Sequence, residues 1–251
     1  MIKLHNITKV FDVDSDLKIA LNNINLEIEE GEFVTVIGAN GSGKSTLFNL
    51  ISGNYFPTKG RILINDEDVT KLELNKRVSE IGVVFQDPLS GTAKDMSVIE
   101  NLILANIRNK RRTLKWGFKK DDNEFYKTLL KTLNLGLENN LNKKIGTLSG
   151  GQRQAITLLM ATLSNPKLLL LDEHTAALDP KTAETVLNIT NQIVKEKNLT
   201  TIMITHNMRD ALNYGNRLIM LKDGEIVFDV KGSEKESLTI KELLFKFEDI
   251  E

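Results

Sequence analysis

The chain lacks several features that would narrow its function at once. It has no cysteine among its 251 residues, which excludes disulfides and thiolate metal sites and fits a reducing compartment. It has no apolar run near the roughly 20 residues of a membrane span, so a membrane role must come through a partner. Its formal net charge is only −1, which removes the simplest argument for nucleic-acid binding, and we expect no nucleic-acid partner.

The apolar patterning predicts a single α/β domain. Short apolar or alternating runs predict strands at 24–28, 33–37, 61–64, 81–85, 168–171, 201–205, 217–221 and 225–228. Helices are predicted at 44–51, 180–195 and 238–251. The dipeptide Asp223-Gly224 predicts a hairpin turn between the last two strands.

A helical insert interrupts this pattern from about residue 97 to residue 163. Within it, Phe125, Leu129 and Leu133 recur at the four-residue spacing of an amphipathic helix. The expected parts of the domain are a core of residues 1–90 and 165–251 and a helical subdomain of residues 91–164.

A glycine-rich segment carries the strongest motif. Residues 38–45 read GANGSGKS and match G-x-x-x-x-G-K-[ST] between a predicted strand and a predicted helix. Glycines let successive backbone N–H groups converge on phosphate oxygens, and the helix N-terminus adds favourable partial charge. Lys44 should reach the β- and γ-phosphates, and the Ser45 hydroxyl should bind Mg²⁺. The alternative is a glycine-rich turn with an exposed lysine. The motif predicts ATP held by Gly38, Asn40, Gly41, Ser42, Gly43, Lys44, Ser45 and Thr46.

Two further segments fit a nucleotide site. Asp172 and Glu173 end a four-leucine run, where a buried strand would place carboxylates beside the phosphate loop. We expect Asp172 to bind Mg²⁺ and Glu173 to polarise the attacking water, although a solvated strand end is the alternative. Ser149 and Gln152 form a capping-box pattern at the start of a helix, and the glycines between them also allow close approach of an anion.

With these motifs in this order, the chain from about residue 2 to residue 228 resembles the ATP-binding subunits of ABC transporters. The resemblance implies a P-loop NTPase core of ABC type, with an inserted helical subdomain and an N-terminal antiparallel β portion. It also implies that the signature residues Ser149, Gly150, Gly151 and Gln152 contact the γ-phosphate bound by the opposite subunit.

The same resemblance assigns four further residues. Gln86 would sense Mg²⁺ and link to the insert, and Asp179 would lie in the loop that crosses the dimer interface. His206 would hold the γ-phosphate, and Phe11 would lie against the adenine ring. Three of them also have a structural interpretation: Gln86 as a surface residue, Asp179 as a helix N-cap, and His206 as a strand-end residue or cap.

Two features remain outside these motifs. His174 stands where many family members have proline, and we interpret it as an ordinary polar loop residue rather than as a metal ligand with His206. Residues 108–120 read RNKRRTLKWGFKK, a basic segment that could lie near anionic headgroups or an acidic partner surface, although a solvated loop is the simpler interpretation.

The resemblance also implies partners and a location. We expect an ATP-dependent head-to-tail homodimer, separate transmembrane permease subunits and an extracytoplasmic substrate-binding protein, with the chain peripheral on the cytoplasmic side of the membrane. Stretches such as LDEHTAALDPKTA are similar to a bacterial subgroup assigned to amino-acid uptake of the tryptophan or tyrosine type. The alternative is a soluble ABC-type ATPase that acts on nucleic acid or ribosomes.

Overall fold

The computed structural model describes residues 2–13, 16–77, 80–107 and 122–250. Its N-terminal part is a four-stranded antiparallel sheet, as expected. The sheet has the order β2-β1-β4-β5 and consists of β1 (Ile2–Val13), β2 (Asp16–Ile28), β4 (Lys59–Ile64) and β5 (Glu67–Asp68). In β2 the inward side chains from Leu21 to Ile28 alternate with exposed ones, which is the pattern of a sheet with one buried face.

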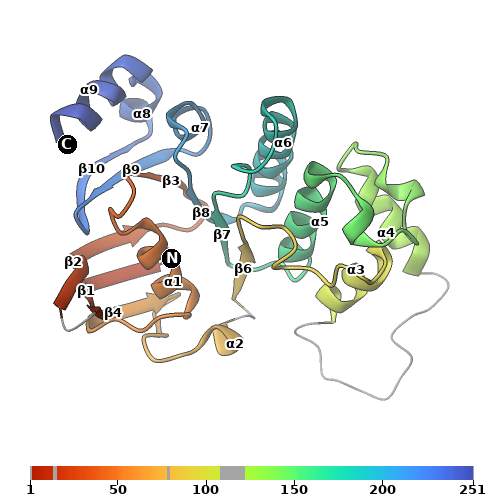
Figure 1. The fold of residues 1–251 in the computed structure, drawn as a ribbon, viewed down its shortest axis with the longest axis horizontal. Coiled ribbons are helices and arrows are strands. Elements are labelled where there is room, and N and C mark those ends of the chain that lie inside the picture. The colour runs from red at the N-terminus through yellow and green to blue at the C-terminus, as the bar shows by residue number, and fades with distance from the viewer. Residues whose placement is uncertain (1, 14–15, 78–79, 108–121, 251) are drawn as a thin grey trace.

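The second sheet is the centre of the molecule (Figure 1). It has the order β10-β9-β3-β8-β7-β6 and consists of β3 (Phe33–Ile37), β6 (Ile81–Val84), β7 (Leu168–Asp172), β8 (Thr200–Ile204), β9 (Arg217–Lys222) and β10 (Glu225–Lys231). All neighbouring pairs are parallel except β9 and β10. Those two strands are joined by the predicted turn, where Asp223 and Gly224 have φ values of 48° and 79°.

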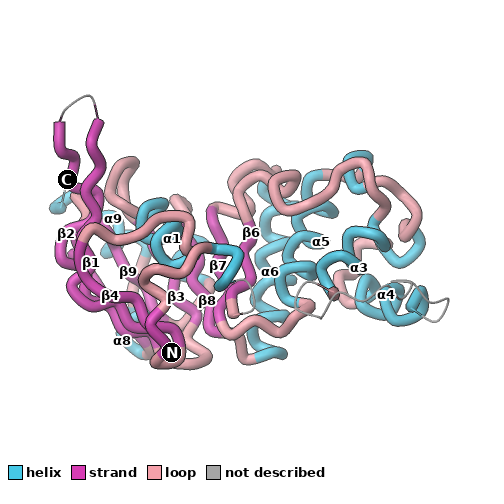
Figure 2. The backbone as a smooth tube through the Cα atoms, turned by 90° about the horizontal axis from the view of Figure 1, so that it is seen from below, coloured by secondary structure: helices cyan, strands magenta, loops and turns pink. Residues whose placement is uncertain are grey.

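Helices surround this sheet and extend to one side of it. They are α1 (Lys44–Ser52), α2 (Leu74–Arg77), α3 (Val98–Asn106), α4 (Asp122–Lys131), α5 (Gly150–Thr162), α6 (Pro180–Lys197), α7 (Met208–Asn213), α8 (Ser233–Ser237) and α9 (Ile240–Ile250). In both ribbon views α3, α4 and α5 form a group at the end of the molecule beyond β6 (Figures 1 and 2). No helix in the described part of the chain is both long enough and apolar enough to cross a membrane.

The helical insert departs from the sequence prediction in two respects. Phe125 is half exposed, whereas the buried side chains of this region are Tyr126, Leu130 and Leu133. The chain turns after Lys131, so the four-residue spacing does not continue along one helix face. The predicted C-terminal helix over 238–251 is confirmed as α9, and the short helix α8 before it has no counterpart in the prediction. The basic residues 108–120 lie outside the described residues.

A small apolar cluster at the sheet edge bears on the site. Ile37 at the end of β3 packs with Met220 of β9, Ala211 of α7 and Leu243 of α9. The residue after Ile37 is the first glycine of the phosphate loop. The C-terminal helix is therefore joined to the elements that carry the loop and the segment around His206.

Candidate functional site

The phosphate loop lies at the carboxyl end of β3, where open parallel sheets place their ligands. Gly43, at φ 104°, is the N-cap residue of α1. A Cβ at Gly43 would lie 2.6 Å from the carbonyl oxygen of Ala20, and one at Gly38 would lie 2.3 Å from that of Leu221. Both glycines are thus required for close packing against β2 and β9, and for freedom of the loop backbone.

Lys44 is folded into the loop that precedes it. Its ammonium group donates hydrogen bonds to the carbonyl oxygens of Gly38, at 2.7 Å, and Ala39, at 2.9 Å. The residue is buried, and this burial lowers the pKa of the ammonium group. The exposed lysine of the alternative interpretation is therefore wrong.

Two carboxylates stand at the tip of the neighbouring strand β7. Burial raises the pKa of Asp172, and the charge of Glu173 raises it further, while Lys44 opposes both effects. Glu173 has a φ of 42°, an unusual conformation for a residue other than glycine. Its N–H donates to the carbonyl oxygen of Ile204 at 3.0 Å, so the ladder between β7 and β8 holds it in place. Strained backbone of this kind concentrates at functional sites.

His206 meets Glu173 across the end of the sheet. The imidazole Nδ1 lies 3.4 Å from the Glu173 carboxylate oxygen Oε2, and the imidazole is largely exposed. These two residues are 33 positions apart in sequence but follow the paired strands β7 and β8. The structure therefore brings together three predicted site residues from separate segments: Lys44, Glu173 and His206.

A cavity of about 290 Å³ lies along the loop. Phe11 forms one wall with residues 43–46, and Glu173 also contacts the space. The Phe11 ring meets Tyr55 edge to face at 5.4 Å between centroids, and the Lys9 ammonium lies 4.8 Å from the Phe11 centroid. Sequence reasoning missed Lys18 and Ala20 of β2, which also line the cavity, because no motif marks them.

The signature segment lies elsewhere. Ser149 is the exposed N-cap residue of α5, and its hydroxyl accepts from the Gln152 N–H while Gln152 Oε1 accepts from the Ser149 N–H. The capping box is thus confirmed. A Cβ at Gly151 would lie 2.1 Å from Cγ2 of Thr182, so this glycine also allows α5 to pack closely on α6. In both views α5 lies apart from α1 (Figures 1 and 2).

Gln86 and Asp179 are two further residues that the resemblance assigns to the site, and they lie after β6 and at the start of α6. Val84 pairs with Leu171 in parallel register, so Gln86 follows β6 at the same level as Glu173 follows β7. Gln86 is exposed and is not among the residues that line the Phe11 cavity. Asp179 is the N-cap residue of α6 and accepts from the Thr182 N–H at 3.1 Å. Hydrogen bonding from the Thr182 side chain and from its N–H lowers the pKa of the Asp179 carboxyl.

The interpretation of His174 as an ordinary loop residue is wrong. Its side chain is 2% exposed, and Nε2 lies 3.2 Å from the Thr190 hydroxyl of α6. That hydroxyl donates to the carbonyl oxygen of Val186, so it accepts a hydrogen bond from the neutral imidazole. Burial lowers the pKa of His174 to about 4. No group of three or more His, Asp or Glu side chains suited to a metal occurs among the described residues.

Comparison with known proteins agrees with these features. The ABC transporter family matches residues 21–176. The tyrosine transport ATP-binding protein of Clostridioides difficile is 47% identical over 99% of both chains. An energy-coupling factor transporter ATP-binding protein of Clostridium perfringens is 35% identical over 96% of this chain and 84% of its own length.

The solved structures include a dimeric ATP-binding cassette in a post-hydrolysis state, bound to ADP and phosphate. This chain matches it with a TM-score of 0.79 and 34% identity, over 92% of this chain and 98% of the other. Sequence family, fold and the position of the phosphate loop all agree. The chain therefore belongs to the ABC transporter family, as an ATP-binding subunit with ATPase activity.

Proposed function

We propose that two copies of this chain close head to tail over two ATP molecules and drive a transporter. The observation that carries the proposal is the separation of α1 and α5 within one chain (Figures 1 and 2). The exposed Ser149 end of α5 has free helix N-terminal charge but no phosphate loop of its own beside it. A second copy, related by a twofold axis, places its loop at this helix end and its own α5 end at this loop, so the pair forms two shared sites. The related cassette bound to ADP and phosphate is dimeric.

In the proposed site the phosphate loop binds the nucleotide. Backbone N–H groups of residues 41–46 and the α1 N-terminus meet the phosphates, and Lys44 exchanges its two carbonyl contacts for the β- and γ-phosphate oxygens. Phe11 offers its ring to the adenine, because it forms a wall of the same cavity. The Ser149 end of α5 from the partner copy covers the γ-phosphate.

Glu173 and His206 act on the hydrolytic step. Glu173 orients the attacking water and accepts its proton, and its backbone hydrogen bond to Ile204 holds the carboxylate in place. His206, 3.4 Å from that carboxylate, donates a hydrogen bond to the γ-phosphate and orients Glu173. A positioned base of this kind contributes roughly 10²–10⁴-fold to a rate.

The residues of the site fit Mg²⁺. The partly buried Asp172 carboxylate supports this, because burial and the charge of Glu173 raise its pKa and a cation would favour its ionised form. The described residues contain no dedicated metal cluster, and Mg²⁺ is typically held by one or two carboxylates with phosphates and waters. Ser45, Asp172 and Gln86 would hold the ion. When bound, it supplies charge neutralisation on the β- and γ-phosphates.

The proposed cargo is an amino acid, taken up through separate membrane subunits with an extracytoplasmic binding protein. The support is the relative named for tyrosine transport, whose identity is 47% over the full length, against 35% for the energy-coupling factor relative. Asp179 would contact the partner copy, and Gln86 would link the nucleotide to the helical insert, which would contact the permease. In this proposal the chain lies on the cytoplasmic face of the membrane.

The shared site can be tested on the isolated chain by light scattering. We expect Glu173→Gln to be a dimer with Mg-ATP and a monomer with ADP or without nucleotide. Adding Ser149→Arg should abolish the dimer, because the new side chain lies at the helix end that covers the phosphate. Asn142→Arg, an exposed position seven residues upstream, is the control that should still dimerise. A dimer insensitive to Ser149→Arg would contradict the shared site.

The cargo needs a separate experiment. The chain is purified with its membrane subunits, reconstituted in liposomes and supplied with ATP. Uptake of labelled tyrosine, lost in Glu173→Gln, is the expected result. Uptake of another solute in place of any amino acid would overturn the cargo and leave the ATPase assignment intact.

A further inference from the structure

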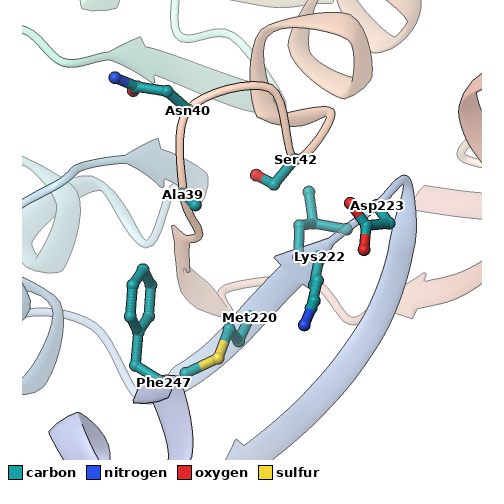
Figure 3. A pocket seen from close by; sticks show the side chains of 8 residues that line it. Ala39, Asn40, Ser42, Met220, Lys222, Asp223 and Phe247 are labelled. Atoms are coloured by element: carbon teal, nitrogen blue, oxygen red, sulfur yellow. The ribbon is translucent and has the colours of Figure 1, made fainter. Parts of the chain in front are cut away.

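A second cavity lies on the other flank of the phosphate loop (Figure 3). Its volume is about 300 Å³, at the lower end of the range for small-molecule sites. The loop contributes Ser42, the end of β9 contributes Met220 and Lys222, the turn contributes Asp223, and α9 contributes Phe247. Of the loop residues beyond Asn40, only Ser42 lines this cavity, whereas residues 43–46 line the Phe11 cavity. Asn40 lines both cavities, and the other residues of their walls differ.

One side of this second cavity is apolar. Met220 is buried, and Phe247 of α9 packs against the same cluster as Leu243. Figure 3 shows the Phe247 ring and the Met220 thioether on one side of the space. An aromatic ring and a sulfur atom together favour a large apolar or aromatic group, through ring pairing and sulfur–aromatic contact.

The rest of the cavity wall includes polar groups, of which Asp223 is exposed, Lys222 is partly exposed and Ser42 is buried. Lys222 and Asp223 are adjacent and of opposite charge, and neither side chain makes a hydrogen bond or ion pair with another described residue. The Ser42 hydroxyl is buried, with the residue only 4% exposed, and it has no partner among the described residues. A buried hydroxyl without a partner is unfavourable, and a hydrogen bond to a ligand would remove that cost.

We propose that this cavity binds a free α-amino acid with a large apolar or aromatic side chain. Its carboxylate pairs with Lys222, its ammonium pairs with Asp223, and its side chain lies between Phe247 and Met220. A ligand with one charge would leave one of the two rim charges unpaired. All residues that line this cavity belong to one copy of the chain. The proposal therefore does not depend on which cargo the transporter carries.

The test is calorimetric titration of the full chain with L-tyrosine and L-phenylalanine. Saturable binding is expected for both, and none for 3-phenylpropionate or phenethylamine, which each carry one of the two charges. Lys222→Gln and Asp223→Asn should each weaken binding by about tenfold, the order of one charged hydrogen bond. Asparagine tolerates the φ of 48° at position 223, so the turn is kept.

Phe247→Ala should abolish binding, whereas Phe245→Ala on the same helix should leave it unchanged, because Phe245 is 63% exposed and outside the cavity. Phe247→Leu provides a less disruptive variant if alanine unfolds α9, and it should weaken binding of the aromatic ligands. Absence of saturable binding, or affinity unchanged in both charge variants, would overturn the proposal. ATP-dependent dimerisation of the same preparation is scored separately, so the two proposals fail independently.

Discussion

The two halves of the proposed nucleotide site are built in opposite ways. At the tips of β3 and β7, polar groups from distant segments converge: Lys44 is buried, Asp172 has a raised pKa, and Glu173 has an unusual backbone conformation. At the start of α5, Ser149 and Gln152 satisfy each other within one turn of helix. The half at the strand tips carries charged groups whose charges a bound ligand can balance. The other half is locally complete and offers only a helix end.

This difference shows what each half contributes. A site of desolvated, shifted groups is suited to chemistry, because such groups respond to small changes in charge around them. A capped helix end is suited to recognition, because it can meet an anion without losing its own hydrogen bonds. Substitutions in the strand-tip half should therefore change mainly activity. Substitutions in the α5 half should change mainly stability and association.

The largest expected effect lies in the strand-tip half. Glu173→Gln should lower the ATPase rate by about 10²–10⁴-fold while ATP affinity stays within a few-fold, because the proton acceptor is lost and the phosphate loop is kept. Steady-state phosphate release and equilibrium nucleotide binding measure the two quantities. Glu184→Gln, an exposed glutamate of α6, is the control and should retain the wild-type rate. Equal losses in both variants would show that Glu173 has no special role.

The next effect concerns His174, which lies directly after Glu173. Its folded pKa of about 4 is below the usual 6.5, so the unfolded chain binds the extra proton first. The stability contributed by the neutral imidazole is thus complete above about pH 6.5 and is lost as the pH falls toward 4, by about 3 kcal/mol. Denaturant unfolding at pH 7 and pH 4 measures this. His174→Gln should lose about 3 kcal/mol less than wild type over that range, and an equal loss would contradict the assignment.

In the α5 half, packing gives a smaller effect. A Cβ at Gly151 would meet Thr182 Cγ2 at 2.1 Å, so Gly151→Ala should lower the free energy of unfolding by about 1–3 kcal/mol. Thr182→Ser removes that methyl group, and in this background Gly151→Ala should cause much less destabilisation. A double-mutant cycle by urea unfolding gives the coupling. Independent effects would show that Gly151 serves the phosphate contact alone.

The smallest effect tests the cap itself. Ser149→Ala removes the hydroxyl that accepts from the Gln152 N–H and should lower stability by about 1 kcal/mol. The basal pH profile of hydrolysis should keep its shape, because Ser149 titrates nothing. Asp179→Ala, which removes the cap of α6, serves as a second capping variant of similar size. A stability loss of several kcal/mol in Ser149→Ala would remove the contrast between the two halves.

Much of the site could be predicted because its signals are local. The glycine-rich loop, the carboxylates after a leucine run and the capping box each occupy a few consecutive residues with a physical reason for their order. His174 and Gly151 were misjudged or incompletely explained because their partners, Thr190 and Thr182, lie on another helix. Phe125 was placed on the wrong face because spacing within one short helix does not say which side meets the rest of the insert.

The sequence by itself determined the order of strands and helices, the phosphate loop and the residue types that nucleotide chemistry needs, because these depend on neighbours along the chain. Only the tertiary structure decided which of these residues meet. Parallel pairing of β7 with β8 brings Glu173 to His206, and the return of α9 encloses the cavity beside Ser42. Such contacts depend on strand register and helix packing between segments far apart in sequence, which no local pattern specifies.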